Sequence, residues 1–219
     1  MPSSSRAARP PTPAEPDSRR AEICRAAARI FRERGFDATA MSDIARTLRM
    51  TKAGLYHYFP SKEAMLFEIM QFGLDRMCDE VITPAEAVRD PEARLRKMMM
   101  QHARIITRAE GVVAQLFHEQ RALPAHMRKV INDQERRYFY VLRDTLKELK
   151  TQGRLRDDVD LSIAALSLIG MVQWLPRWFR PDGRMTIDQA AREITDLGFA
   201  AILKPAVRRA SRRRSSPAA

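Results

Sequence analysis

The stretch that most constrains how this chain can fold is Thr39–Lys62, which reads TAMSDIARTLRMTKAGLYHYFPSK. Its first part carries apolar residues at helical spacing, and the hydroxyl of Thr39 or Ser42 can cap that helix. Thr51 can cap a second short helix, in which apolar residues again lie one turn apart. Two short helices joined by a tight turn form a helix-turn-helix, whose second helix enters the DNA major groove.

The rest of the chain also shows helical periodicity, and β-alternation appears nowhere. Gly35 follows the first apolar helix in the position of a C′ residue, and Ser61 can cap the helix after the motif. Pro124 suits the first turn of a later helix. The sequence therefore predicts an all-α fold. Further helices are expected over about 18–34, 62–82, 91–108, 112–122, 124–150, 161–179 and 187–203, with a break at Pro176 inside 161–179.

Helical periodicity breaks over 83–91, and this break predicts the boundary between a small N-terminal domain and a larger C-terminal one. Residues 1–17 are rich in Pro, Ser and Ala and predict a disordered arm. We expect a three-helix helix-turn-helix domain over 18–79, with the motif itself at about 42–61. A larger helical domain is expected over 80–205, followed by a basic, disordered tail over 206–219.

Charge points to a polyanionic partner. The formal net charge is +12, from 39 Lys and Arg against 27 Asp and Glu. Residues 21–62 carry an excess of basic residues, and the tail holds five arginines and no acidic residue. This balance does not choose between DNA, RNA and anionic lipid. The tail is read either as a solvated end or as a nonspecific DNA-binding segment.

Several classes of protein are disfavoured. The chain has no apolar run long enough for a transmembrane helix, and its first twenty residues lack the apolar region of a secretory signal. Cys24 and Cys78 form no metal-ligand pattern and are expected to be reduced thiols. The four histidines show no nucleophilic or metal-binding arrangement. We therefore expect no catalytic residue, no metal, no cofactor and no membrane partner.

Residues from about Arg19 to Asp79 resemble the DNA-binding domain of the TetR/AcrR family of bacterial transcriptional regulators. The matching pieces are AAARIFRERGF (26–36), T-x-x-x-D-I-A (39–45) and TKAGLYHYFPSK (51–62). The turn departs from the family's usual A-G-V-S, since Arg49 stands at the glycine. Arg49 is thus expected to need φ > 0, at a cost of about 1 kcal/mol that a phosphate contact would offset.

Each residue of the motif has a physical role in DNA binding. Thr51 offers a hydroxyl and a helix N-terminus to a phosphate, whereas Lys52 and His57 can reach base edges. Gly54 lets the backbone approach the DNA. Tyr56 is read either as a phosphate ligand or as an edge of the core, and Lys62 as a phosphate clamp. The expected DNA contacts are Thr39, Ser42, Arg49, Thr51, Lys52, Gly54, Tyr56, His57, Tyr58 and Lys62.

One recognition helix reads few base pairs, so a homodimer on a palindromic, double-stranded operator is expected. The last two long helices carry broad apolar faces, which either pair between subunits or are buried within one subunit. The resemblance implies pairing into a four-helix bundle. The expected interface residues are Leu161, Ala165, Leu168, Val172, Ile187, Ala191, Ile194 and Ala201.

A small-molecule effector is expected to bind in the larger domain. The segment 173–186 places tryptophans and an arginine one turn apart, which suits an anionic ligand with an apolar part. It resembles family members that respond to acyl-CoA thioesters of fatty-acid, steroid or aromatic-acid breakdown. Another hydrophobic inducer, or none, remains open, and the apolar set can also be plain core. The expected ligand residues are Met98, Met99, His102, Phe117, Tyr138, Leu142, Trp174, Arg177 and Trp178.

The sequence thus predicts a ligand-responsive transcriptional repressor that acts on DNA in the bacterial cytoplasm, associated with the nucleoid. Ligand binding would release the operator by favouring a conformation with lower affinity for DNA. The alternative is an architectural DNA-binding protein without an inducer, which would show steep salt dependence and no operator preference.

Overall fold

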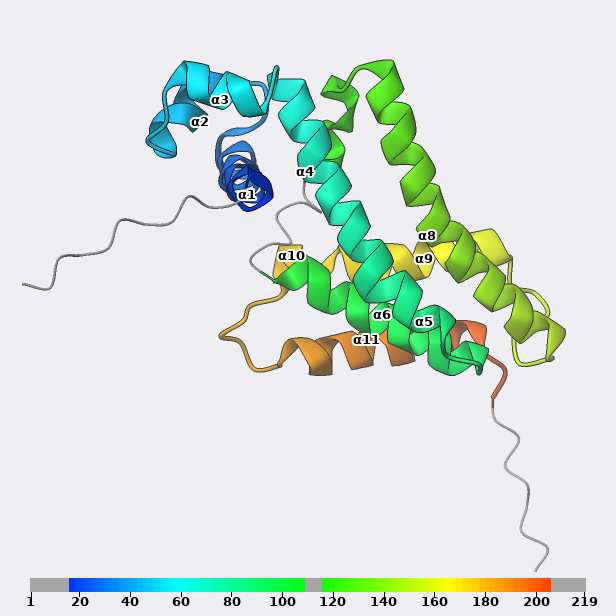
Figure 1. Cartoon of the computed structure of the whole chain (residues 1–219). Coiled ribbons are helices and arrows are strands. Elements are labelled where there is room, and N and C mark those ends of the chain that lie inside the picture. The colour runs from blue at the N-terminus through cyan, green and yellow to red at the C-terminus, as the bar shows by residue number, and fades with distance from the viewer. Residues whose placement is uncertain (1–15, 109–115, 206–219) are drawn as a thin grey trace, which may run out of the picture. The chain divides into compact units, whose positions relative to one another are not determined.

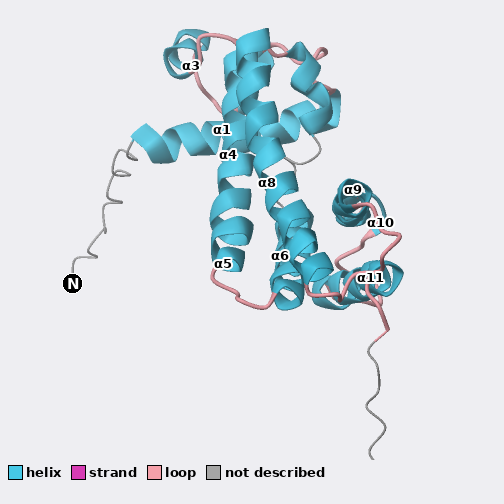
Figure 2. Ribbon diagram, turned by 90° about the vertical axis from the view of Figure 1, so that its right-hand side faces the viewer, coloured by secondary structure: helices cyan, strands magenta, loops and turns pink. Residues whose placement is uncertain are grey.

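The structure, a computed structural model, describes residues 16–108 and 116–205, with side chains over 19–108 and 118–205. Every regular element within these residues is a helix, and Leu155 and Leu203 form an isolated antiparallel bridge (Figure 2). The predicted all-α fold is confirmed. Among the described helices, none is long and apolar enough to cross a membrane.

The chain forms two compact units that are interleaved in sequence. The first contains the residues up to Asp75 together with Ala109–Gln134, and the second contains Arg76–Arg108 and the residues from Glu135 onward. The predicted division near residue 80 treats each domain as one continuous segment. The compact units differ from it because a later segment returns to complete the core of the first.

The first unit holds the helix-turn-helix. Its elements are α1 (Pro16–Arg34), α2 (Met41–Thr47), α3 (Lys52–Tyr58), most of α4 (Lys62–Met77), the 3-10 helix η3 (Leu116–Ala122) and the start of α8 (Ala125–Thr151) (Figure 1). Their apolar faces meet in one core, to which η3 and α8 add Leu123 and Ile131. The fully buried members include Ile23, Ala27, Phe31, Ile44, Leu55, Phe59, Met65, Leu66, Ile69 and Met70.

Local chemistry explains where these helices begin and end. Gly35 adopts φ +83° and donates to the carbonyl of Phe31, so it ends α1 as predicted. The Ser61 hydroxyl accepts from the Ala64 N–H at 3.0 Å and starts α4, again as predicted.

The second unit is built around α6 (Pro91–Thr107). Helix α6 packs against α9 (Leu161–Gln173), α10 (Leu175–Trp178) and α11 (Ile187–Ile202), and against the π-helix η1 (Cys78–Ile82) and α5 (Thr83–Glu86). Figure 1 shows α11 running alongside α6. Arg104 on α6 binds Asp188 on α11 through both carboxylate oxygens, at 2.7 and 3.0 Å.

Some predicted elements need correction. The helix expected over 62–82 changes to π geometry at Cys78, and α5 extends helical structure into the predicted break. The break expected at Pro176 falls two residues earlier, at Trp174, because Pro176 lies in the first turn of α10 and cannot donate a backbone hydrogen bond. The described part of 112–122 is a 3-10 helix rather than an α-helix. Residues 16 and 17 belong to α1, whereas the remainder of the predicted arm, residues 112–115 and the predicted tail lie outside the described residues.

Candidate nucleic-acid interface

Helix α3 presents a polar face to solvent. Its N-cap is Thr51, whose Oγ1 accepts from the Gly54 N–H at 3.0 Å, so the predicted cap is confirmed. Leu55 is buried in the core, while Lys52 and His57 are exposed. The core contact thus fixes one side of α3 and leaves long polar side chains on the other, as a helix that enters a major groove requires.

The structure gives a reason for glycine at position 54 that the sequence did not reveal. A Cβ at this position would lie 3.1 Å from the Thr51 Oγ1, closer than most Cβ contacts. Glycine therefore makes room for the hydroxyl that caps α3. Its expected approach to DNA stays a prediction.

The start of α2 differs from the prediction. The N-cap is Ala40, and its N–H donates to the Asp43 carboxylate at 3.2 Å. Thr39 is 1% exposed, and its hydroxyl donates to the Gly35 carbonyl at 2.7 Å. The predicted cap by Thr39 or Ser42 is therefore wrong, since Thr39 holds the preceding turn and Ser42 lies inside α2, where it is exposed.

Arg49 has the strained backbone that the sequence predicts, with φ 53°. It is the C′ residue of a Schellman motif, because the Met50 N–H bonds the Ala45 carbonyl at 2.9 Å and the Arg49 N–H bonds the Arg46 carbonyl at 3.1 Å. The Arg49 side chain is exposed in the turn before α3. This position is open to a DNA phosphate.

Two of the predicted contacts also serve the fold. Tyr58 is half-buried and packs against the core of the first unit. The Lys62 ammonium donates to the Phe36 carbonyl at 2.8 Å and lies 4.3 Å from the centre of the Phe36 ring. Its expected contact with a DNA phosphate stays a prediction.

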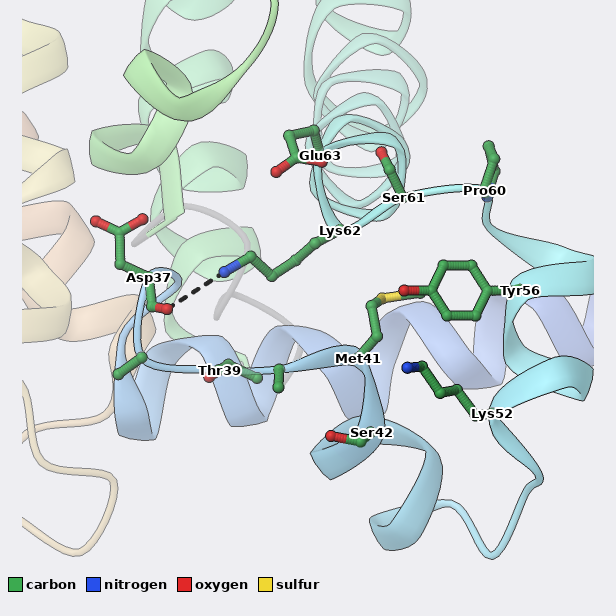
Figure 3. Close-up of a pocket in the computed structure, with 12 residues that line it drawn as sticks. Asp37, Thr39, Met41, Ser42, Lys52, Tyr56, Pro60, Ser61, Lys62 and Glu63 are labelled. Carbon is green, nitrogen blue, oxygen red and sulfur yellow. Dashed lines mark hydrogen bonds between the residues drawn. The ribbon is translucent and has the colours of Figure 1, made fainter.

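A surface pocket of about 510 Å³ lies between α2, α3 and the start of α4 (Figure 3). It brings together five of the ten predicted contacts: Thr39, Ser42, Lys52, Tyr56 and Lys62. Arg49, Thr51, Gly54, His57 and Tyr58 do not line it. The pocket is polar on several sides and holds two lysines, so it can accept a phosphate group from a neighbouring strand.

Sequence reasoning missed three polar residues of this pocket, Asp37, Ser61 and Glu63. Ser61 was recognised as a cap, and that role was the available signal, because a capped helix N-terminus attracts anions. Asp37 and Glu63 carry the opposite charge to Lys52 and Lys62. They restrict where in the pocket a phosphate would be stable.

The predicted dimer residues divide between two faces. Ala165, Leu168, Val172 and Ala191 are buried within the second unit and have little surface left for a partner. Leu161, Ile187 and Ile194 are partly buried, and Ala201 is exposed. Large apolar side chains lie on the outer faces of α9 and α11: Ile163, Leu166 and Leu197 are 64%, 56% and 65% exposed. Leu197 belongs to the apolar face expected of the last helix, whereas Ile163 and Leu166 were not predicted.

The predicted ligand residues also divide. Met98, Met99, His102, Tyr138 and Leu142 are buried in the second unit. Trp174 and Trp178 are exposed, and the Arg177 guanidinium lies 5.3 Å from the centre of the Trp174 ring. The Phe117 side chain lies outside the described residues.

His102 and Tyr138 form a polar pair in this apolar interior. The His102 Nδ1 lies 3.0 Å from the Tyr138 hydroxyl, and the two rings meet edge to face. Burial lowers the pKa of His102 to about 4 and raises that of Tyr138 above its usual range. Both groups are therefore neutral at pH 7, and the pair can hydrogen-bond a carbonyl without burying a charge.

Within the described residues, no group of three or more His, Cys, Asp or Glu side chains is arranged to hold a metal ion. Cys24 and Cys78 are both free thiols. Burial raises the pKa of Cys24 to about 12, so this thiol is unreactive at neutral pH.

Known proteins resemble this chain over both units. Residues 23–69 match the family model "Bacterial regulatory proteins, tetR family", and residues 88–202 match "Tetracyclin repressor-like, C-terminal domain". The transcriptional repressor KstR2 of Rhodococcus jostii is 28% identical over 200 residues, which cover 89% of this chain and 98% of that protein.

Solved structures of bacterial regulators also resemble this chain. The crystal structure of AibR with isovaleryl coenzyme A and operator DNA is 35% identical, with a TM-score of 0.75, and the match covers 82% of this chain and 97% of that one. The ketosteroid regulator KstR2 of Mycobacterium tuberculosis is 27% identical with a TM-score of 0.78, covering 87% and 98%. The matched family models together span most of both compact units, and the chain belongs to the TetR family of bacterial transcriptional regulators.

Proposed function

We propose that this protein is a repressor that binds a palindromic DNA operator as a homodimer and releases it when a small molecule binds the second unit. The observation that carries the proposal is the outward face of α3. Lys52, Tyr56 and His57 are exposed there, on a helix that Thr51 caps and Leu55 anchors. The function places the protein with the DNA in the bacterial cytoplasm, and we assign it no catalytic role.

Lys52 and His57 are the proposed readers of base edges. A lysine in the major groove prefers the O6 and N7 acceptors of guanine. Ser42 on α2, Arg49 in the turn before α3 and Tyr56 on α3 are proposed to bind phosphates. These contacts set the register of the helix without reading sequence.

The effector is proposed to be an acyl-CoA thioester. AibR, which this chain resembles at 35% identity, was solved with isovaleryl coenzyme A and operator DNA together. In this chain the neutral His102–Tyr138 pair could bond the thioester carbonyl, among apolar neighbours such as Met98 and Leu142 that suit an acyl chain. The exposed Trp174 and Arg177 offer a ring and a cation to the nucleotide part.

The architectural alternative has no observation in its favour among the described residues. It rests on the basic tail, which lies outside them.

One assay tests the proposal. Operators are selected from random duplex DNA with the purified protein, and affinity is measured by fluorescence anisotropy. Lys52→Ala is expected to cost about 1–3 kcal/mol and to relax preference at one base position. The control is Lys147→Ala, an exposed lysine on α8 in the second unit, which should bind as the wild type does.

The same complex tests the effector. Acyl-CoA thioesters of increasing chain length are added, with free coenzyme A and the free acids as controls. We expect release by a thioester and by neither control. If no thioester releases the operator, the acyl-CoA assignment fails, while selective operator binding would still stand. Absence of any preferred sequence would reject the repressor itself.

A further inference from the structure

Arg20, in the N-terminal part of α1, forms a forked ion pair with Glu68 on α4. Its Nε donates to the Glu68 Oε1 at 2.5 Å, and its Nη2 donates to the other carboxylate oxygen. The two residues are 48 positions apart, so the pair joins two helices of the first unit. A forked arginine–carboxylate pair fixes the mutual orientation of its partners as well as their separation.

The same guanidinium covers Phe59, the residue that ends α3. The Arg20 Cζ lies 4.6 Å from the centre of the Phe59 ring, and Phe59 is fully buried. A cation over the face of an aromatic ring is attracted to it. The Phe59 N–H donates to the Leu55 carbonyl at 3.0 Å and closes the last turn of α3. Arg20 therefore contacts both α4 and the C-terminal end of the helix that is proposed to read DNA.

Helix α3 has few contacts that fix its position. Within Lys52–Tyr58, Leu55 is the one buried residue, and Phe59 follows the helix directly. An ion pair in open solvent would add little, because water screens it. The Arg20 and Glu68 side chains are both half-buried, and the guanidinium rests on a buried ring, so this pair is more constrained than a surface one. Its loss would free the end of α3 that Phe59 holds.

We infer that Arg20 and Glu68 are positioning residues: their ion pair holds α1 against α4 and covers Phe59, and so fixes the orientation in which α3 meets the operator. This role rests on the proposed DNA-binding function. Glu68 would then strengthen operator binding although its charge has the same sign as that of DNA.

The sign of the effect of Glu68→Gln tests this role. Affinity is measured by fluorescence anisotropy for the selected operator and for a scrambled duplex, after correction for the active fraction. If only charge mattered, removal of an acidic residue would strengthen binding to both duplexes. We expect instead a several-fold loss of operator affinity, with no loss for the scrambled duplex.

Glu33→Gln is the matched control. It also removes one acidic charge from α1–α4 of the first unit, at the exposed end of α1, where Glu33 makes only a long ion pair of 3.9 Å with Arg32. This variant should bind the operator at least as well as the wild type.

Variants of Arg20 separate positioning from charge. Arg20→Lys keeps the positive charge but lacks the planar fork, so it should lose nearly as much operator affinity as Glu68→Gln. Arg20→Gln combined with Glu68→Gln should lose little more than either single variant, because each already breaks the pair. Full affinity in Arg20→Lys, no loss of operator affinity in Glu68→Gln, or additive losses in the double variant would each overturn the inference.

Hydrogen exchange gives a readout that does not depend on DNA. The Phe59 amide should exchange several-fold faster in Glu68→Gln than in the wild type. The Leu48 amide, which bonds the Ile44 carbonyl at the end of α2, should be unaffected. Unchanged exchange at Phe59 would contradict the inference, and so would equal acceleration at both amides, which indicates a general loss of stability. If the wild type selects no operator, the proposed function fails, and this measurement still decides whether the pair holds α3.

Discussion

At the scale of single residues, Arg49 stands where glycine would fold more easily. Its φ of 53° lies in the left-handed region, which costs a residue with a Cβ about 1 kcal/mol. The Schellman hydrogen bonds around it do not use its side chain. The strain therefore gives no benefit to folding, and a contact outside the chain is the physical reason to keep an arginine here.

Arg49→Gly is expected to raise the free energy of unfolding by up to about 1 kcal/mol while weakening operator binding. Arg49→Ala should weaken binding similarly without the gain in stability, because alanine keeps the strain. Urea denaturation and the anisotropy assay measure the two effects. Equal stability of the two variants would show that the turn is relaxed, and full affinity in both would remove Arg49 from the interface.

The burial of His102 makes the free energy of unfolding depend on pH. Its pKa falls from 6.5 in the unfolded chain to about 4 in the folded protein, because burial disfavours the charged ring. Below about pH 6.5 the unfolded chain therefore binds a proton that the folded protein does not, so stability is lost as pH falls. The loss should approach about 3 kcal/mol by pH 4.

Urea denaturation between pH 7.5 and 4.5 measures this loss. His102→Gln, which retains a hydrogen-bonding group but cannot titrate, is the matched control and should show a flatter dependence. Asp90 and Asp188 also have a lowered pKa, from hydrogen bonds with Arg154 and Arg104, but they titrate at lower pH and affect both proteins equally. Parallel curves for the two proteins would refute the assignment.

At the scale of elements, the parts that sequence reasoning predicted well depend on neighbours in the chain. Gly35 at the end of α1 and the caps of α3 and α4 involve residues within four positions of one another. The positive φ of Arg49 was expected from the family resemblance, because glycine usually stands at that position of the turn. Such signals need no knowledge of the tertiary fold.

The errors arise where a distant contact or a competing local hydrogen bond decides. Thr39 has a hydroxyl suited to a cap, but it donates instead to the Gly35 carbonyl four residues earlier. The sequence also did not reveal that the Lys62 ammonium donates to the Phe36 carbonyl, because these residues are 26 positions apart. The π geometry of η1 was missed too, since helical periodicity continues through it.

The residues of α9 that would face a second subunit could not be predicted from the sequence either. This helix is apolar almost all round, so periodicity cannot say which stripe faces its own subunit. The structure shows Ala165, Leu168 and Val172 turned inward and Ile163 and Leu166 outward. On α11, Gly198 also faces the interior of its own subunit, where an added Cβ would lie 2.6 Å from the Leu168 side chain. The proposed interface therefore moves to the outward stripe.

At the scale of the whole molecule, the outward faces of α9 and α11 are proposed to pair with a second copy. Isolated exposed leucines are common, but Ile163, Leu166 and Leu197 lie on two helices that pack together. Gly170 on the same exposed side of α9 meets no described atom within 4 Å of an added Cβ. A partner helix can approach the backbone closely at that point.

Leu166→Glu should therefore convert the dimer to monomer at micromolar concentration, since burying two carboxylates in an apolar interface is costly. Sedimentation velocity measures the change, and operator affinity should fall with it, because a monomer reads one half-site. Lys147→Glu, on the exposed side of α8, should remain dimeric. A wild type that sediments as a monomer would contradict the proposal, as would a dimer that tolerates Leu166→Glu.

The shallow anchoring of α3 has a consequence for how such a regulator can evolve. Within Lys52–Tyr58, Leu55 is the one buried residue, and Thr51 supplies the cap from outside the helix. Substitutions at Lys52 or His57 remove no core contact, so they should alter stability by less than about 0.5 kcal/mol. Operator preference can therefore drift among descendants of one gene without compensating changes elsewhere, and new binding specificities can be engineered on the same stable framework.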